Sequence, residues 1–270
     1  MKYSIITINY NNRDGLRKTI ESVVNQTCTD FEYIVIDGGS TDGSVDVINE
    51  YADRIDFWVS EPDKGIYNAM NKGISRAHGE YLNFMNSGDC LHDANVLKDL
   101  LPWLTADVVF GRAYYPQIDS YYKPHNPMTL FYCCLGLEHQ SEFYRKTLFD
   151  KSGYDERFRF VADWKFTVEN VVKEGCSYCC ADIVVADYDL SGFSSVNEQA
   201  VLKERYDALG TLFPSRLVTD YMFFSKLRTP LLEEIPSWVK HPILHKSIVY
   251  MAHLLTKLFK IVYRLTGKHF

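Results

Sequence analysis

The chain has 270 residues, of which 46% are hydrophobic and 24% charged, and a formal net charge of −6. These values are ordinary for a folded protein and exclude a disordered chain, and the acidic balance argues against a dedicated nucleic-acid-binding protein, which is usually basic. The length accommodates one large α/β domain, or one domain with a short appendage.

Two features of the composition allow more than one interpretation. Aromatic residues make up 14% of the chain, which fits either core packing or the recognition of sugar rings. Three of the seven cysteines, Cys176, Cys179 and Cys180, resemble part of a zinc site, although their apolar surroundings favour small buried side chains. The odd number of cysteines, and a first strand that begins at Tyr3 without a secretory pattern, predict a reducing cytoplasmic location.

Strands and helices alternate along the first third of the chain. Short apolar runs predict buried strands at 3–8, 33–36, 57–59 and 81–85. Helical spacing of apolar residues predicts a helix after each of the first three strands, the second with Val45, Ile48 and Tyr51 on one face. This alternation is typical of a parallel α/β sheet.

Polar motifs follow each of these predicted strands, at 9–12, 37–42, 63–64 and 87–89. Ligands of parallel α/β sheets bind beyond the carboxyl ends of the strands. The four motifs are therefore expected to converge on one binding site.

The second half of the chain has a more mixed pattern. Strands are predicted at 107–110, 142–144 and 183–186, a hairpin or irregular loop at 114–123, and helices at 162–173 and 198–209.

Residues 213–270 differ in character from a first domain at 1–212. No acidic residue follows Glu234, whereas basic residues recur among apolar ones. This stretch is too interrupted by charge to span a bilayer. It is typical of a basic amphipathic helix on an anionic membrane surface, and equally of a helix that packs on the domain or forms a dimer contact.

Two aspartates at strand ends are candidates for binding a nucleotide. Asp89 follows Gly88, and a carboxylate there suits Mg²⁺ or Mn²⁺, which need few protein ligands because phosphate and water complete their shell; the alternative is a helix cap. Asp37 opens a glycine-containing turn at 37–43 that does not fit the dinucleotide fingerprint. Its carboxylate either accepts hydrogen bonds from a base or ribose, or organises the turn.

Taken in order, these motifs resemble the inverting family 2 glycosyltransferases. The resemblance is carried by SIITINYNN at 4–12, SVVNQT at 22–27 and IDGGSTDGS at 36–44. The segments EPDKGIYNAMNKG at 61–73 and NSGD at 86–89 are similar to the polysaccharide-assembly branch, close to colanic-acid-type transferases. The resemblance covers about residues 3 to 210.

The resemblance implies a GT-A fold, a Rossmann-like mixed and largely parallel sheet flanked by helices, and a nucleotide-sugar donor. It makes Asp89 the metal ligand. Gly38 and Gly88, however, stand where many members have aspartates. We therefore expect a weaker contact with the nucleotide base and weaker metal binding, or a broader metal specificity. The residues that it assigns to the nucleotide are Thr7, Asn9, Tyr10, Asp37, Gly38, Asp63, Lys64, Asn68, Ser87 and Gly88.

An inverting transfer needs a general base that deprotonates the acceptor hydroxyl. By resemblance this base is Asp163, although Ala162 replaces the usual glutamate, and a carboxylate in the first turn of a helix is also favoured by the helix dipole alone. Trp164 is expected to stack on a sugar or to pack. His139 and Gln140 are expected to contact the acceptor or the metal-bound diphosphate.

The sequence thus predicts a glycosyltransferase that uses a nucleotide-diphosphate sugar and Mn²⁺ or Mg²⁺. The expected acceptor is a glycan or a polyprenyl-diphosphate-linked chain of cell-surface polysaccharide, at the inner face of the plasma membrane. A nucleotidyltransferase is disfavoured because 9–12 is not a basic glycine-rich loop. A non-catalytic nucleotide-sugar-binding or membrane assembly scaffold is disfavoured by the retention of Asp89 and Asp163.

Overall fold

The computed structural model describes residues 1–133, 136–190 and 197–226, with 246–247, 250–251 and 253–257. The chain divides into two units, Met1–Val218 and Thr219–Phe270, so the division comes after the expected boundary at 212. Most of the predicted basic amphipathic region lies outside the described residues. Among those described, no helix combines the length and apolar character needed to cross a membrane.

One sheet runs through the first unit. Its strands are β1 (Tyr3–Asn9), β2 (Phe31–Asp37), β3 (Phe57–Ser60), β4 (Tyr81–Phe84), β5 (Cys90–Leu91), β6 (Val108–Tyr115), β7 (Ser120–Tyr122), β8 (Glu142–Arg145) and β9 (Tyr178–Asp187). They are ordered β3-β2-β1-β4-β8-β6-β9-β5, with β7 paired to β6. The strands from β3 to β4 are parallel, whereas β8 pairs antiparallel with both β4 and β6.

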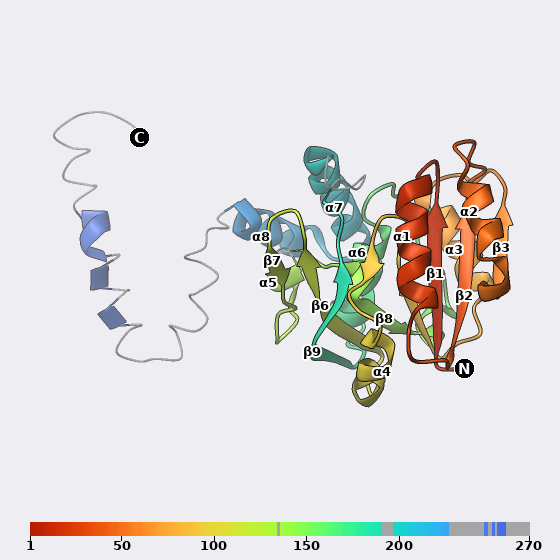
Figure 1. Cartoon of the computed structure of the whole chain (residues 1–270). Helices are drawn as coiled ribbons and strands as arrows, with labels where there is room; N and C mark the ends of the chain where they lie inside the picture. The colour runs from red at the N-terminus through yellow and green to blue at the C-terminus, as the bar shows by residue number, and fades with distance from the viewer. Residues whose placement is uncertain (134–135, 191–196, 227–245, 248–249, 252, 258–270) are drawn as a thin grey trace. The chain divides into compact units, whose positions relative to one another are not determined.

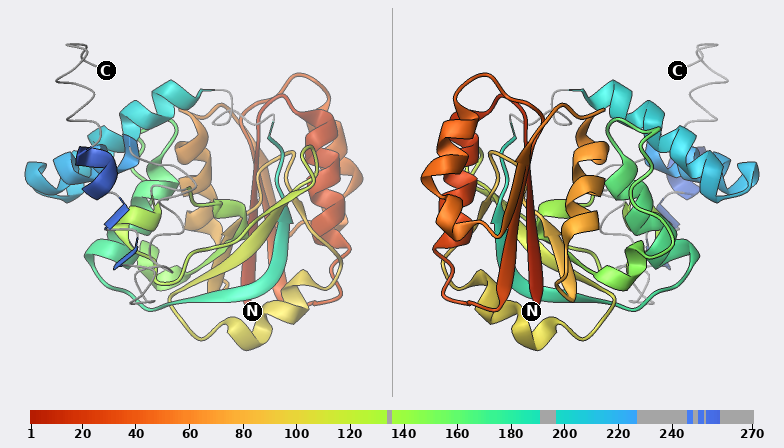
Figure 2. Two further views of the ribbon diagram at one scale, coloured as in Figure 1. Left: turned by 90° about the vertical axis from the view of Figure 1, so that its left-hand side faces the viewer. Right: turned by 90° about the vertical axis from the view of Figure 1, so that its right-hand side faces the viewer.

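Helices cover both faces of the parallel half of the sheet. The first-unit helices are α1 (Arg13–Val24), α2 (Ser44–Glu50), α3 (Ile66–Arg76), α4 (Val96–Leu100), α5 (Leu130–Cys133), α6 (Ala162–Thr167) and α7 (Glu198–Leu212), and α8 (Ser215–Lys226) carries the division between the units. Figure 1 and Figure 2 show α1 and α2 on one side of the strands and α3 on the other. A strand covered on both faces is buried throughout, as β1 is at every position.

The alternation of side chains along β1 supplies a core to each face. Tyr3 and Ile5 join the core formed with α1, α2 and α4, whereas Ile6 points to α3. Contact between β1 and α3 is close, because a Cβ added at Gly73 of α3 would lie 2.5 Å from Ile6 Cγ2. The glycine therefore brings α3 directly onto the sheet.

Helix α2 buries a face that includes one of the three residues expected to share a face. It begins at Ser44 and buries Ser44, Val47 and Ile48, while Val45 and Tyr51 are partly buried. Residues three and four positions after Ser44 share its face of a helix.

The second half of the unit is built around β6. Its far end forms a hairpin with β7, and β9 runs beside it in parallel. After α6 the chain continues as one π-helical segment, Val168–Lys173. Phe166 of α6 stacks on Phe149, with ring centroids 4.3 Å apart, and this aromatic contact fixes the segment that carries Asp163.

Candidate active site

The polar ends of the parallel strands meet at one edge of the sheet, as expected. Asn9 of β1 is in register with Asp37 of β2, and Asp37 with Ser60 of β3. The carboxylate of Asp37 has no exposed surface. It accepts hydrogen bonds from Asn9 Nδ2 at 2.7 Å, Ser60 Oγ at 2.6 Å and Ser40 Oγ at 2.6 Å, and from the backbone N–H groups of Gly39 and Ser40.

These contacts decide the charge and the role of Asp37. Burial alone would raise the pKa of the carboxyl group, but the hydroxyl donors of Ser40 and Ser60 and the other hydrogen bonds hold it below its usual value. The ionised carboxylate ties three strands and the turn together, and Gly39 takes the positive φ of 80° that the turn requires. The observed contacts therefore match the alternative in which Asp37 organises the turn. A contact of Asp37 with a base or ribose stays a prediction.

The other strand-end residues of β1 differ in exposure. Thr7 is fully buried, and its hydroxyl donates to the Met85 carbonyl at 2.8 Å. Asn9 is 4% exposed and bonded to Asp37, whereas Tyr10 is 68% exposed. Because Thr7 is fully buried, it has no surface through which to contact a nucleotide. Tyr10 is the one of these three whose side chain is exposed to solvent.

The segment after β3 lies against the turn of Asp37. A Cβ added at Gly38 would be 2.7 Å from Asp63 Oδ2, so the carboxylate of Asp63 occupies the space that a side chain at position 38 would need. Asp63 Oδ1 accepts from the Gly65 N–H at 3.0 Å, and Asn68 Oδ1 accepts from the Lys64 N–H at 3.1 Å. The Lys64 side chain is exposed.

Asp89 lies at the neighbouring strand end, after β4. It is 6% exposed, and its two carboxylate oxygens accept from Gln140 Nε2 at 2.8 Å and from the Asp189 backbone N–H at 2.9 Å. Burial raises the pKa of Asp89 to about 6. Gly88 takes a positive φ of 111°, and the Ser87 hydroxyl donates to the Asn12 carbonyl, so the segment from 87 to 89 is held against the start of α1.

Asp163 lies in the first turn of α6 and is engaged by residues from other elements. Its Oδ2 is 2.9 Å from His139 Nδ1, and its Oδ1 accepts from the Tyr67 hydroxyl at 2.7 Å and from the Trp164 N–H at 2.8 Å. Burial would raise the pKa of Asp163, but the His139 imidazole and the Tyr67 hydroxyl outweigh it and lower the pKa. The side chain remains 14% exposed.

His139 carries the balancing positive charge. Burial opposes its ionisation, but Asp163, Asp89 and Glu142 raise its pKa to about 9. Both nitrogens of a protonated imidazole are donors. The amide nitrogen of Asn86 lies 3.0 Å from His139 Nε2, and its Oδ1 is buried without a partner among the described atoms. Exchanging the positions of Oδ1 and Nδ2 lets Oδ1 accept a hydrogen bond from the protonated Nε2.

The turn His139–Ser141 connects the two candidate carboxylates. His139 binds Asp163, and the next residue, Gln140, binds Asp89. Asn83, fully buried in β4, anchors this turn by donating to the carbonyls of Gln140 and Glu142 at 2.9 and 3.1 Å. A contact of His139 or Gln140 with the acceptor or diphosphate stays a prediction.

Trp164 takes the packing alternative. It is 4% exposed, its indole N–H donates to the Cys133 carbonyl at 2.9 Å, and the Arg205 guanidinium lies 5.1 Å from its ring centre. A ring covered in this way has no open face for a sugar. The expectation that Trp164 contacts the acceptor is therefore corrected: its side chain packs in the core.

The oxygen atoms at Asp89 are suitable ligands for a hard divalent cation that takes most of its ligands from outside the protein. The described residues contain no group of three or more His, Cys, Asp or Glu side chains placed to hold a metal. They do place the Asp89 carboxylate beside Gln140, whose Oε1 is buried without a partner in the described part of the chain. Mg²⁺ and Mn²⁺ accept sites with one or two carboxylates completed by water and phosphate.

Three residues at the site were not assigned a role from the sequence. Tyr67 and Asn86 lie within motifs that matched the family resemblance, but nothing in their spacing pointed to Asp163 or His139. Asp189 follows the predicted strand 183–186, so the same strand-end rule that identified Asp37 and Asp89 applies to it.

The chain is similar to known glycosyltransferases in sequence and in fold. A PGL/p-HBAD biosynthesis glycosyltransferase of Mycobacterium bovis is 30% identical over 198 residues, which are 70% of this chain and 77% of that protein. TarS of S. aureus (residues 1–349) in complex with UDP-GlcNAc superposes with a TM-score of 0.63 at 19% identity over 82% of this chain and 66% of that one, and this chain spans 39% of the longer TarS structure. The mannosyltransferase PcManGT of Pyrobaculum calidifontis, in complex with GDP-Man and Mn²⁺, gives 0.62 at 13% identity over 99% of this chain and 88% of that one.

These similarities confirm the predicted GT-A type of mixed, largely parallel sheet. The family model for glycosyl transferase family 2 matches residues 4–166, a stretch that contains the ends of the four parallel strands and both Asp89 and Asp163. The chain belongs to glycosyltransferase family 2.

Proposed function

We propose that this glycosyltransferase moves a sugar from a nucleotide-diphosphate donor to a hydroxyl group of a glycan or lipid-linked acceptor in a single, inverting displacement. The observation that supports it best is the turn at 139–140, which binds the proposed base on one side and the proposed metal ligand on the other. His139 holds Asp163, and Gln140 holds Asp89. Functional groups held by one rigid turn keep a fixed geometry through the reaction.

Asp163 is the proposed general base. Its lowered pKa keeps the carboxylate ionised at neutral pH, so it can accept the acceptor's hydroxyl proton while that oxygen bonds to the anomeric carbon. The bond between the anomeric carbon and the diphosphate oxygen breaks, and the nucleoside diphosphate leaves with the bonding electrons. Tyr67 and His139 position the carboxylate and stabilise its charge.

The donor nucleotide is proposed to bind across the strand ends. Asp63, Lys64 and Tyr10 offer accessible groups there, whereas Asp37 fixes the turn on which they rest. Asp89 would hold Mn²⁺ or Mg²⁺, which would neutralise charge on the departing diphosphate. The UDP-GlcNAc bound to TarS and the GDP-Man and Mn²⁺ bound to PcManGT support this type of donor and ion.

A glycan or polyprenyl-diphosphate-linked intermediate of cell-surface polysaccharide is the proposed acceptor. The proposal rests on the similarity of 61–73 and 86–89 to the polysaccharide-assembly branch of the family. The basic residues between 213 and 270 are proposed to contact anionic lipid at the cytoplasmic face of the membrane.

Asp163→Asn tests the assignment of the base. The amide cannot accept the proton, so kcat is expected to fall by about 10²- to 10⁴-fold. The affinity for the nucleoside diphosphate should remain that of the wild-type chain, because Asp163 acts on the acceptor. Transfer is measured by release of nucleoside diphosphate with a panel of nucleotide sugars and lipid-linked acceptors, and binding by calorimetry.

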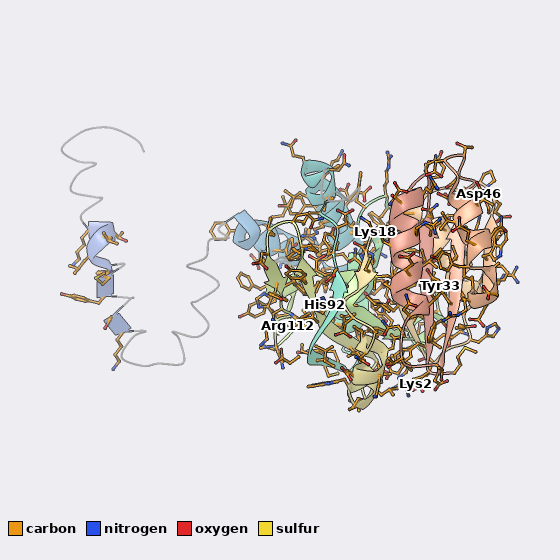
Figure 3. The ribbon with its side chains drawn as sticks, viewed as in Figure 1. Lys2, Lys18, Tyr33, Asp46, His92 and Arg112 are labelled. Carbon is orange, nitrogen blue, oxygen red and sulfur yellow. The ribbon has the colours of Figure 1, made fainter. Side chains whose placement is uncertain are left out.

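Asp46→Asn is the matched control for this substitution. Asp46, labelled in Figure 3, is an exposed aspartate in the first turn of α2. It makes no contact with Asp163 that the structure describes, and this variant should retain full activity. Lost nucleotide binding in a folded Asp163→Asn protein would contradict the assigned role. Absence of transfer by the wild-type chain with every donor would instead favour a non-catalytic scaffold.

A further inference from the structure

A second aspartate, Asp189, reaches the site from a distant part of the chain. It follows the end of β9, and its backbone N–H donates to Asp89 Oδ1 at 2.9 Å. A Cβ added at Gly88 would lie 3.4 Å from Asp189 Oδ2. The Asp189 carboxylate therefore lies beside the residue that precedes Asp89.

Contacts on both sides hold this end of β9 in place. The Tyr188 N–H donates to the Tyr114 carbonyl at 2.8 Å, and Asp187 Oδ1 lies 2.6 Å from Nδ1 of His92, which Figure 3 labels. Gln117, in the hairpin between β6 and β7, donates from Nε2 to Asp189 Oδ1 at 2.9 Å. The position of the Asp189 carboxylate is thus set by the sheet rather than by its own segment alone.

The amide of Gln140 is an independent indication of a polar ligand at this point. Gln140 is 3% exposed, and its Nε2 donates to Asp89 Oδ2. Oε1 of the same amide is buried and lacks a hydrogen-bond partner within the described ranges. Leaving such a group unsatisfied costs about 1–3 kcal/mol, and buried groups of this kind are normally satisfied by protein or by bound water.

We propose that Asp189 is the second protein carboxylate of the divalent-cation site, beside Asp89, and that a water molecule on the cation would donate to Gln140 Oε1. This inference rests on the proposed function. A carboxylate has about four lone-pair sites, so a hydrogen-bonded aspartate can also bind a cation. From the segment after β9, Asp189 supplies the carboxylate that Gly88 lacks. Two carboxylates with water and phosphate oxygens make up the shell that Mg²⁺ and Mn²⁺ prefer.

The test is the affinity of the full chain for Mn²⁺ in the absence of nucleotide, measured from the electron paramagnetic resonance signal of free Mn²⁺. Asp189→Asn keeps the shape of the side chain and is expected to weaken binding by about 10- to 100-fold or more. The matched control is Asp182→Asn, on β9 itself, where the carboxylate is 68% exposed and pairs with Arg112. It should bind Mn²⁺ as the wild-type chain does.

A second variant tests direct ligation even if Asp189→Asn is poorly folded. Because a thiolate favours softer metals, Asp189→Cys is expected to shift metal preference from Mn²⁺ towards Cd²⁺, and Asp182→Cys is not. Wild-type Mn²⁺ affinity in folded Asp189→Asn, with binding lost in Asp89→Asn, would overturn the inference and leave the proposed transfer intact. A wild-type chain that binds no Mn²⁺ would also overturn it, and transfer in the presence of EDTA would then decide the proposed function separately.

Discussion

The charge of Asp163 depends on groups that other elements bring to it. A first-turn carboxylate is ordinarily stabilised by the helix dipole alone. Here Tyr67, from the first turn of α3, donates to Oδ1, and His139 lies against Oδ2. These contacts make Asp163 a partly buried, ionised group with a defined orientation, which is the arrangement that a general base needs.

Tyr67→Phe isolates the contribution of one donor. Loss of a hydrogen bond to the ionised form raises the pKa of Asp163, so the acidic limb of the pH profile of kcat/KM should move to higher pH by about one unit. Tyr154→Phe is the matched control, since Tyr154 packs on the Tyr67 ring and its own hydroxyl has no partner among the described residues. Equal profiles for Tyr67→Phe and the wild-type chain would contradict a role for Asp163 as the titrating base.

At the scale of elements, the contact between α3 and β1 positions Tyr67. Gly73→Ala would push a methyl group to 2.5 Å from Ile6 Cγ2, and the branched Ile6 side chain has little freedom to move. The substitution is expected to lower the free energy of unfolding by about 1–3 kcal/mol, measured by urea denaturation.

Gly210→Ala in α7 is the opposite control for this prediction. No atom of the described residues lies within 4 Å of a Cβ added there, so alanine should stabilise the helix by about 0.5–1 kcal/mol. Unchanged stability of Gly73→Ala would show that α3 shifts on the sheet without cost, which contradicts the close packing described.

Elements with strong local patterns could be predicted from the sequence. The strands of the parallel half are continuous apolar runs because helices cover both of their faces, and the predicted strands 3–8 and 33–36 correspond to β1 and β2. The strands of the second half were harder to predict from the sequence. For example, β9 extends from Tyr178 to Asp187 through partly exposed positions. Its two ends could be recognised as separate strand-like runs, at 177–181 and 183–186, but not as one strand, because pairing with β6 rather than hydrophobicity sets its length.

Across the whole molecule, the site joins segments that are far apart in the sequence. Strand-end position identified Asp37 and Asp89, and the family resemblance identified Asp163, but the hydrogen bonds among them could not be read from spacing. The bridge from Asp163 through the 139–140 turn to Asp89 exists because β8 lies beside β4 in the sheet.

The central claim is that these strand ends bind a nucleoside diphosphate with a divalent cation. The most direct test is the melting temperature of the full chain with UDP, GDP, ADP or CDP, each with and without Mn²⁺. One diphosphate is expected to raise the melting temperature by several degrees, and further with Mn²⁺, because ligand at about 100 times Kd stabilises the folded state by about 2.7 kcal/mol. A folded chain whose melting temperature changes with none of these diphosphates, with or without Mn²⁺, would contradict the account.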